Sequence, residues 1–110
     1  MKKYTQIIAD YLSDLKYENI PEDVVERAKL VTLHTIGAAI AATRTEAGKN
    51  IVEIAKTLGD GGKTATIIGD GTKVGLGNAV LASGTLADLL DWEDCAWTGH
   101  PSAGAVPTGL

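Results

Sequence analysis

The sequence predicts a mainly α-helical domain that carries one short β-hairpin. Three observations predict this class. Apolar residues recur at helical spacing through most of the chain, only the segment TATIIG has the β-branched composition of a strand, and small residues far outnumber aromatic ones, which make up 5% of the chain. Because the chain has 110 residues, we expect one domain over residues 1–110.

The first helix is expected at residues 4–16, where the apolar residues form a single stripe. Pro21 then suits the first position of a second helix, and Glu22 and Asp23 favour the positive end of its dipole. This second helix should run to about residue 43. The stripe of the first helix consists of Tyr4, Ile7, Ile8, Tyr11, Leu12 and Leu15.

The later half of the second helix, TLHTIGAAIAA, is apolar on nearly every side. A helix of this kind is buried on every side, and a domain this small has too few neighbours to surround it. We therefore expect a homo-oligomer or a complementary chain to cover it. His34 lies inside this segment and is expected to be a core histidine with satisfied polar atoms.

A third helix is expected at residues 47–58, stopped by Gly59. A turn at GDGGK then leads to a strand at residues 64–69, with which KVG pairs after the tight turn DGT. The glycines of this segment could suggest a phosphate loop. The GK[ST] of a P-loop is missing, however, so two turns around a short strand explain them better.

A fourth helix is expected at residues 76–92, where small residues such as Gly84 permit close contact with a neighbouring helix. Pro101 suits the first position of a further helical segment. Between these two elements lies the acidic stretch LADLLDWEDCAWTGHPSAG, which is the part of the chain most suited to chemistry.

Charge and composition exclude several classes of protein. The net charge is −4 and the lysines are scattered, so we expect no nucleic-acid partner. A single cysteine, Cys95, excludes an internal disulfide and fits a reducing compartment. Asp10 and Asp14 interrupt the apolar start of the chain, so we expect no secretion signal, and no apolar run has the length of a membrane span. We expect a cytoplasmic protein.

If the fourth helix continues through the acidic stretch, Asp88, Asp91 and Asp94 lie three residues apart on one face. Partly buried carboxylates of this kind have raised pKa values and can carry protons. His100 follows, and histidine titrates near neutrality and suits general acid or base catalysis. A carboxylate and an imidazole held together could then move a proton beside a substrate carboxylate.

Each of these residues also has a structural interpretation. We expect Asp88, Glu93 and Asp94 to be charges in solvent or at a helix end. For Asp91, a catalytic or orienting role and a purely structural role are equally compatible with the sequence. His100 stands directly before Pro101 and could cap the next helix.

Cys95 lacks a nearby basic residue that would lower its pKa, which favours a structural thiol. A metal site built from Asp91, Asp94, Cys95 and His100 would mix hard and soft ligands at no standard spacing, so we expect none.

Several segments, in this order, resemble the N-terminal part of the MmgE/PrpD family. They are IPEDVVERAKLVTLHTIGAAIAA, TATIIGDGTKVGLGNAVLASGTLADLLDWED and GHPSAG, so the resemblance covers nearly the whole chain. It implies an all-helical domain, a smaller lid domain and a dimer. It also implies a lyase or isomerase that acts on a small di- or tricarboxylate without an organic cofactor, as in the proton abstraction and elimination of 2-methylcitrate dehydratase.

The resemblance also implies which residues form the site. The family has an acidic motif like LDxDD and a later HPS, which Asp91 and His100 match by position as catalytic residues. Asp94, Cys95 and Ser102, in or beside the same motifs, are the expected substrate-binding residues.

Three positions depart from the family pattern. Where this chain has His34, the family usually has aspartate. It often has histidine at the position of Asp88 and threonine at the position of Cys95. These departures leave the substrate open. Family members are several times longer, so we expect this chain to be a piece, or one chain of a split enzyme, that is inactive alone. The alternative is a non-catalytic helical assembly module derived from the family.

Overall fold

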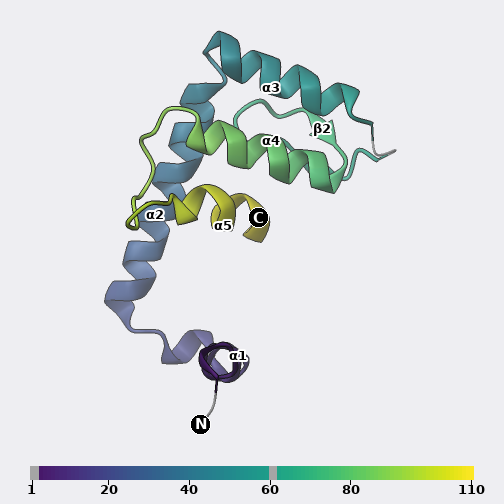
Figure 1. Ribbon diagram of the computed structural model, residues 1–110. Helices are drawn as coiled ribbons and strands as arrows, with labels where there is room; N and C mark the ends of the chain where they lie inside the picture. Colours follow the sequence, from purple (N-terminus) through teal and green to yellow (C-terminus); the bar gives the residue numbers. More distant parts are fainter. Residues whose placement is uncertain (1–2, 60–61) are drawn as a thin grey trace.

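The computed structural model describes residues 3–59 and 62–110, so part of the turn expected at GDGGK, residues 60 and 61, lies outside the described residues. Figure 1 shows a mainly helical chain with one short hairpin, as the sequence predicts. The elements, in chain order, are α1 (Tyr4–Asp14), a 3-10 turn (Tyr17–Asn19), α2 (Glu22–Ala42), α3 (Glu46–Thr57), β1 (Ala65–Thr66), β2 (Lys73–Val74), α4 (Leu76–Asp88) and α5 (Pro101–Gly109).

The core lies around α4, which packs against α2, α3, α5 and the hairpin, while α2 also contacts α5. Alanine dominates it, which lets the helix backbones approach closely. A Cβ added at Gly84 of α4 would lie 3.1 Å from the carbonyl oxygen of Ala103 in α5, so the close contact predicted at this glycine joins two helices of the same chain. The buried cluster consists of Ala39, Ala42, Val52, Ala55, Ile67, Val74, Ala79, Ala82, Leu86, Ala87 and Ala103.

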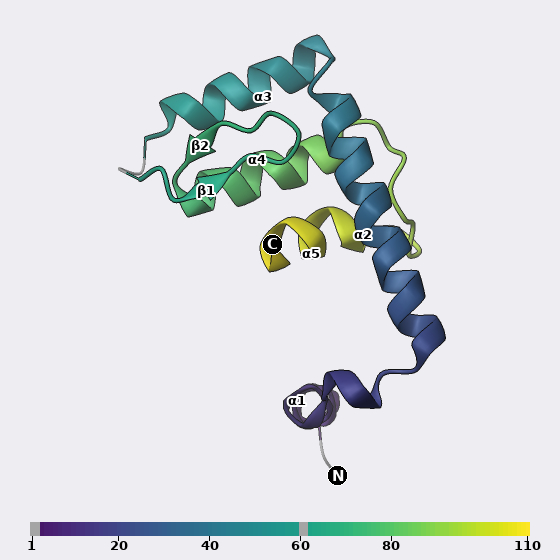
Figure 2. The same cartoon turned by 180° about the vertical axis from the view of Figure 1, so that it is seen from behind.

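The hairpin packs beside α4, as the reverse view shows (Figure 2). Its strands are antiparallel and pair Ala65 with Val74 and Thr66 with Lys73. The prediction of a strand over residues 64–69 was too long, because the chain enters a turn after Thr66 in which the amide of Gly71 donates to the carbonyl of Ile67.

The turn of the hairpin is anchored on two helices. Gly69 has a φ of +90°, and a Cβ at this position would lie 2.9 Å from the Cα of Ile40 in α2, so a side chain would collide with that helix. The hydroxyl of Ser83 in α4 accepts a hydrogen bond from the amide of Ile68 at 3.0 Å. Glycine and serine therefore fix the hairpin against α2 and α4.

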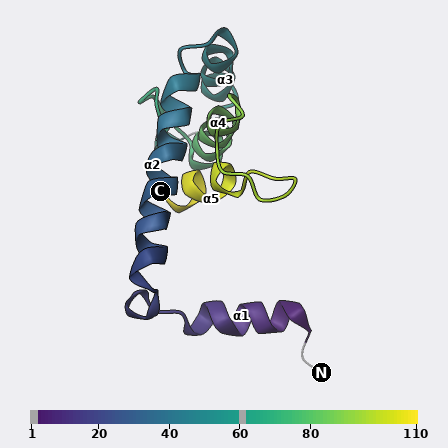
Figure 3. The same ribbon diagram turned by 90° about the vertical axis from the view of Figure 1, so that its left-hand side faces the viewer.

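Two helices at the N-terminal end leave apolar surface uncovered. Figure 3 shows α1 lying crosswise at the foot of α2, away from the other helices. No residue of α1 is buried, and Tyr4 at the start of its apolar stripe is 87% exposed. In α2 the residues Thr35, Ala38, Ala39 and Ala42 are buried, whereas Leu33 and Ile40 are exposed. The partner expected to cover this surface stays a prediction.

Most predicted helix ends lie within two residues of the observed ones, and the end of α4 differs by more. Pro21 precedes the first residue of α2 as its N-cap instead of standing at the first helical position. The fourth helix ends at Asp88, four residues before Trp92, because the chain turns there and Asp91 takes a φ of 54° that no helix allows. None of the described helices combines the length and the apolarity that crossing a bilayer requires.

Candidate active site

The acidic stretch folds as a loop between α4 and α5. The amide of Asp91 donates to the carbonyl of Asp88 at 3.2 Å, which turns the chain away from the α4 axis. Farther on, Ala96 and Gly99 exchange backbone hydrogen bonds of 2.9 and 3.2 Å around Trp97, whose φ is 61°. The prediction that Asp88, Asp91 and Asp94 share one helix face was therefore wrong, since only Asp88 is helical.

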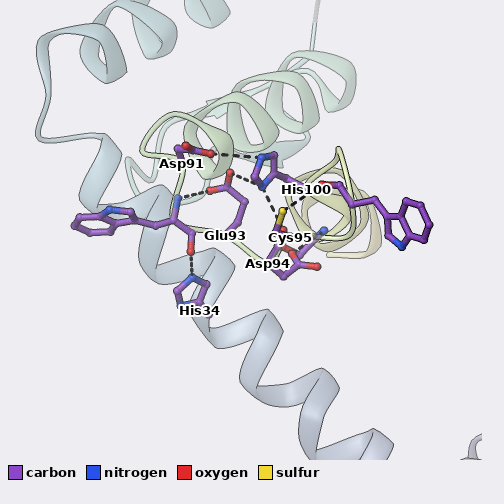
Figure 4. Close-up of polar contacts among 9 residues, drawn as sticks. His34, Asp91, Glu93, Asp94, Cys95 and His100 are labelled. Atoms are coloured by element: carbon purple, nitrogen blue, oxygen red, sulfur yellow. Dashed lines mark hydrogen bonds and ion pairs between the residues drawn. The ribbon is translucent and has the colours of Figure 1, made fainter.

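The loop brings His100 between two carboxylates (Figure 4). Its Nε2 lies 3.4 Å from Oδ1 of Asp91, and its Nδ1 lies 3.2 Å from Oε1 of Glu93. Nδ1 also lies 3.3 Å from the carbonyl oxygen of Asp94. The His100 side chain is 29% exposed. The carboxylate that faces Nε2, of Asp91, is 86% exposed, whereas the one that faces Nδ1, of Glu93, is fully buried.

Glu93 is the residue of this cluster whose surroundings the sequence did not predict. We predicted a solvated or helix-end charge, but its side chain is fully buried. Its Oε2 accepts a hydrogen bond from the amide of Trp92 at 3.0 Å. Its Oε1 lies at an ion-pair distance of 3.2 Å from Nδ1 of His100 and has no hydrogen-bond partner among the described residues. A buried carboxylate is stable only with partners of this kind. The sequence carries no signal of this burial, because Glu93 stands in a run of acids in a segment without periodicity.

Asp94 caps the helix that follows the loop. Its Oδ1 accepts a hydrogen bond from the amide of Ser102, in the first turn of α5, at 3.1 Å. His100 stands at the N-cap position of α5, as its structural interpretation predicts, but its side chain makes no cap hydrogen bond and Asp94 supplies the side-chain acceptor instead. Ser102 itself is buried, and its Oγ has no hydrogen-bond partner among the described residues.

An open hollow of about 440 Å³ lies beside His100. Asp88 borders it from the end of α4, and Ala103 and Gly104 border it from α5. The remaining lining residues are Gly84 and Thr85. A small molecule in this hollow would lie against both His100 and Asp88.

The donor atoms of Asp88, Glu93 and His100 lie within 4.8 Å of one another, close enough to approach one cation. This set differs from the four residues weighed in the sequence, since Cys95 is exposed and directs its Sγ toward the carbonyl of Trp97 at 3.7 Å. Glu93 already has the imidazole as its partner in this group.

His34 was predicted to be a core histidine, which is wrong. The residue is exposed on α2, and its Nε2 lies 2.5 Å from the carbonyl oxygen of Trp92. A carbonyl oxygen only accepts hydrogen bonds, so Nε2 is the donor. His34 thereby fastens the start of the acidic loop to α2, a role that the apolar sequence around it does not indicate.

Comparison with known proteins gives one match. The family described as the MmgE/PrpD N-terminal domain matches residues 6–110. No curated protein and no solved structure matches the chain.

Proposed function

This chain belongs to the MmgE/PrpD family, and on that premise we propose that it supplies the His100 part of a site that moves a proton beside a carboxylate of a small di- or tricarboxylate. One observation carries the proposal. A half-buried imidazole stands between two carboxylates, and its Nε2 faces the open side of the site, 3.4 Å from Asp91.

In the proposed step, Nε2 of His100 takes the proton from the carbon next to a substrate carboxylate. The C–H electron pair stays on the substrate and is delocalised into that carboxylate, or forms a double bond as a hydroxyl group leaves the neighbouring carbon. The imidazolium that forms has Asp91 on one side and Glu93 on the other, and both carboxylates stabilise its positive charge. Delivery of a proton to the opposite face of the same carbon would give epimerisation instead.

The charge around His100 limits where the rest of the site comes from. Four acids lie near the ring, Asp88, Asp91, Glu93 and Asp94. Among the described residues, no lysine or arginine lines the hollow or forms an ion pair with this group. A substrate with two or three carboxylates would be repelled here unless cationic groups faced it. We therefore propose that a second copy or a complementary chain brings those cations, with Asp94, Cys95 and Ser102 as the further substrate-binding residues of this chain.

The test is an elimination assay on the full chain, together with any polypeptide that co-purifies with it. A panel of hydroxy di- and tricarboxylates is followed by NMR for the unsaturated product. We expect His100→Gln to lower the rate by at least about 10²-fold, the usual contribution of a general base. Glu26→Gln, an exposed change on α2, is the control and should leave the rate unchanged. Equal rates for wild type and His100→Gln would overturn the proposal.

The alternative function is a helical assembly module without catalysis. The exposed apolar stripe of α1 favours it, because exposed apolar surface of this extent marks an interaction site. Under this alternative, His100→Gln would leave function intact, while changes on α1 would abolish association.

A further inference from the structure

We infer that Glu93 is a positioning residue that holds His100 as the tautomer protonated on Nδ1, which leaves Nε2 as the nitrogen that exchanges protons with a ligand. The inference concerns the site of the proposed function and rests on that function only for the identity of the ligand. The tautomer itself follows from the atoms around the ring.

Nδ1 of His100 faces two oxygen atoms. Oε1 of Glu93 lies 3.2 Å away, and the carbonyl oxygen of Asp94 lies 3.3 Å away. A carbonyl oxygen has no proton to give, and an ionised carboxylate only accepts. Only the contact with Asp94 is a hydrogen bond, whereas Oε1 of Glu93 has no hydrogen-bond partner among the described residues and acts on Nδ1 through its charge. Because the carbonyl of Asp94 can only accept, Nδ1 is the N–H of the ring, and the buried negative charge of Glu93 beside it favours the proton on this nitrogen.

Glu93 can hold this orientation because its own carboxylate is fixed. The side chain is fully buried, and its second oxygen, Oε2, accepts from the amide of Trp92 at 3.0 Å. The carbonyl of Trp92 is in turn bound by Nε2 of His34. A continuous set of polar contacts therefore runs from α2 through the loop to Nδ1 of His100, and Figure 4 shows the labelled side chains along it.

The opposite side of the ring is built differently. Nε2 faces Oδ1 of Asp91 at 3.4 Å, and the Asp91 side chain is largely in solvent. From α4, Asp88 contributes a carboxylate within 4.8 Å of the donor atoms of Glu93 and His100. The sequence of α5, PSAGAVPTG, contributes no charged side chain. Of the two nitrogens, Nδ1 makes a hydrogen bond, to the carbonyl of Asp94, whereas Nε2 has only the ion-pair contact with the exposed carboxylate of Asp91, which a ligand can replace.

The tautomer is measurable without a substrate. The full chain, labelled with ¹⁵N-histidine, gives signals from two histidines only, and His100→Gln assigns them by the loss of one set. In the neutral form of His100 we expect a pyrrole-like Nδ1 and a pyridine-like Nε2. Unconstrained histidine prefers the opposite tautomer, so the wild-type spectrum alone decides: a pyrrole-like Nε2 overturns the inference.

Two variants then test the role of Glu93. Glu93→Gln keeps the volume and the carbonyl of Asp94 but removes the negative charge beside Nδ1, so we expect the Nδ1 resonance to shift part of the way from the pyrrole-like value toward the averaged value of free histidine. Asp91→Asn leaves both partners of Nδ1 in place, and the Nδ1 resonance should stay pyrrole-like. An unchanged Nδ1 resonance in folded Glu93→Gln would overturn the assignment of Glu93 as the positioning residue.

The outcomes separate this inference from the proposed function. If His100 has the expected tautomer but the protein transforms no carboxylic acid, the inference stands and the proposed function is refuted. If the activity depends on His100 but the spectrum shows a pyrrole-like Nε2, the inference is refuted and the proposed function stands.

Discussion

The carboxylate of Glu93 lies 3.2 Å from Nδ1 of His100, although no part of the Glu93 side chain reaches solvent. A buried carboxylate costs free energy unless a donor or a cation faces it, so each of these two residues stabilises the other in the folded state. The pair also defines the centre of the acidic loop, because Asp91 and Asp94 are arranged around the same ring.

Replacing His100 should therefore destabilise the fold as well as the site. His100→Gln leaves the buried Glu93 carboxylate without its ionic partner, and we expect a loss of about 1–3 kcal/mol in the free energy of unfolding. Glu93→Gln combined with His100→Gln should cost less than the sum of the two single changes, since the buried charge is then absent. Urea unfolding of the three variants measures this coupling, and strictly additive losses would contradict the pairing.

The cap of α5 gives a second prediction. Asp94→Ala removes the oxygen that accepts from the amide of Ser102, and we expect a loss of about 1 kcal/mol, typical of a lost helix cap. Asp94→Asn keeps a side-chain oxygen at the same position and is the matched control, expected within about 0.5 kcal/mol of wild type. Thermal unfolding compares the two, and an equal loss in both variants would show that the cap is not what Asp94 contributes.

The hairpin turn offers a matched pair of glycines. Gly69 and Gly71 both have positive φ values, +90° and +84°. A Cβ at Gly69 would meet the Cα of Ile40 at 2.9 Å, whereas a Cβ at Gly71 would meet nothing within 4 Å. Both alanine variants carry backbone strain of about 1 kcal/mol, and Gly69→Ala should lose about 1–3 kcal/mol more because α2 must move. Equal losses in urea unfolding would refute the packing of the turn on α2.

The stripe of α1 should matter for association and not for the fold of one chain. Ile8 and Leu12 are both exposed, so Ile8→Ser and Leu12→Ser should change the free energy of unfolding of a single chain by no more than about 0.5 kcal/mol. We expect the same variants to weaken any complex that the protein forms. Native mass spectrometry measures the complex, and an unchanged assembly would mean that α1 is not its contact surface.

One exposed pair predicts a pH dependence. A hydrogen bond to Glu53, with the charges of Glu53 and Asp70, raises the pKa of Lys56 above its ordinary value of 10.5. A raised pKa in the folded state means that the contribution of Lys56 is complete below pH 10.5 and is lost as the pH rises through the higher folded value. Glu53→Gln should flatten this alkaline decline, and a decline of equal steepness in both proteins would contradict the assignment.

The helices were predictable because their signals are local. Apolar spacing located α1, the first-position proline located α5, and the small residues of α4 indicated its contact with α5. The end of α4 was not predictable, because Asp91 continues the sequence pattern of a helix while its backbone turns left-handed. A single residue outside helical geometry therefore moved the whole acidic stretch from a helix face to a loop.

The candidate site was predictable only in part for the same reason. The match to the family motifs selected Asp91 and His100, and the structure brings these two side chains together. Their catalytic roles stay predictions, as do the substrate-binding roles of Asp94, Cys95 and Ser102. The burial of Glu93 and the contact of His34 depend on a loop that folds back onto α2, and no periodicity in the sequence encodes such a contact between distant residues.

The most direct test of the central claim is solvent exchange at the carbon next to a carboxylate. The protein, with any chain that co-purifies, is incubated in D₂O with di- and tricarboxylates, and deuterium in the recovered acids is measured by NMR. The account predicts that wild type exchanges a C–H proton of at least one acid and that His100→Gln slows this exchange by about 10²-fold or more. Exchange at the same rate in both proteins would show that His100 is not the group that moves the proton.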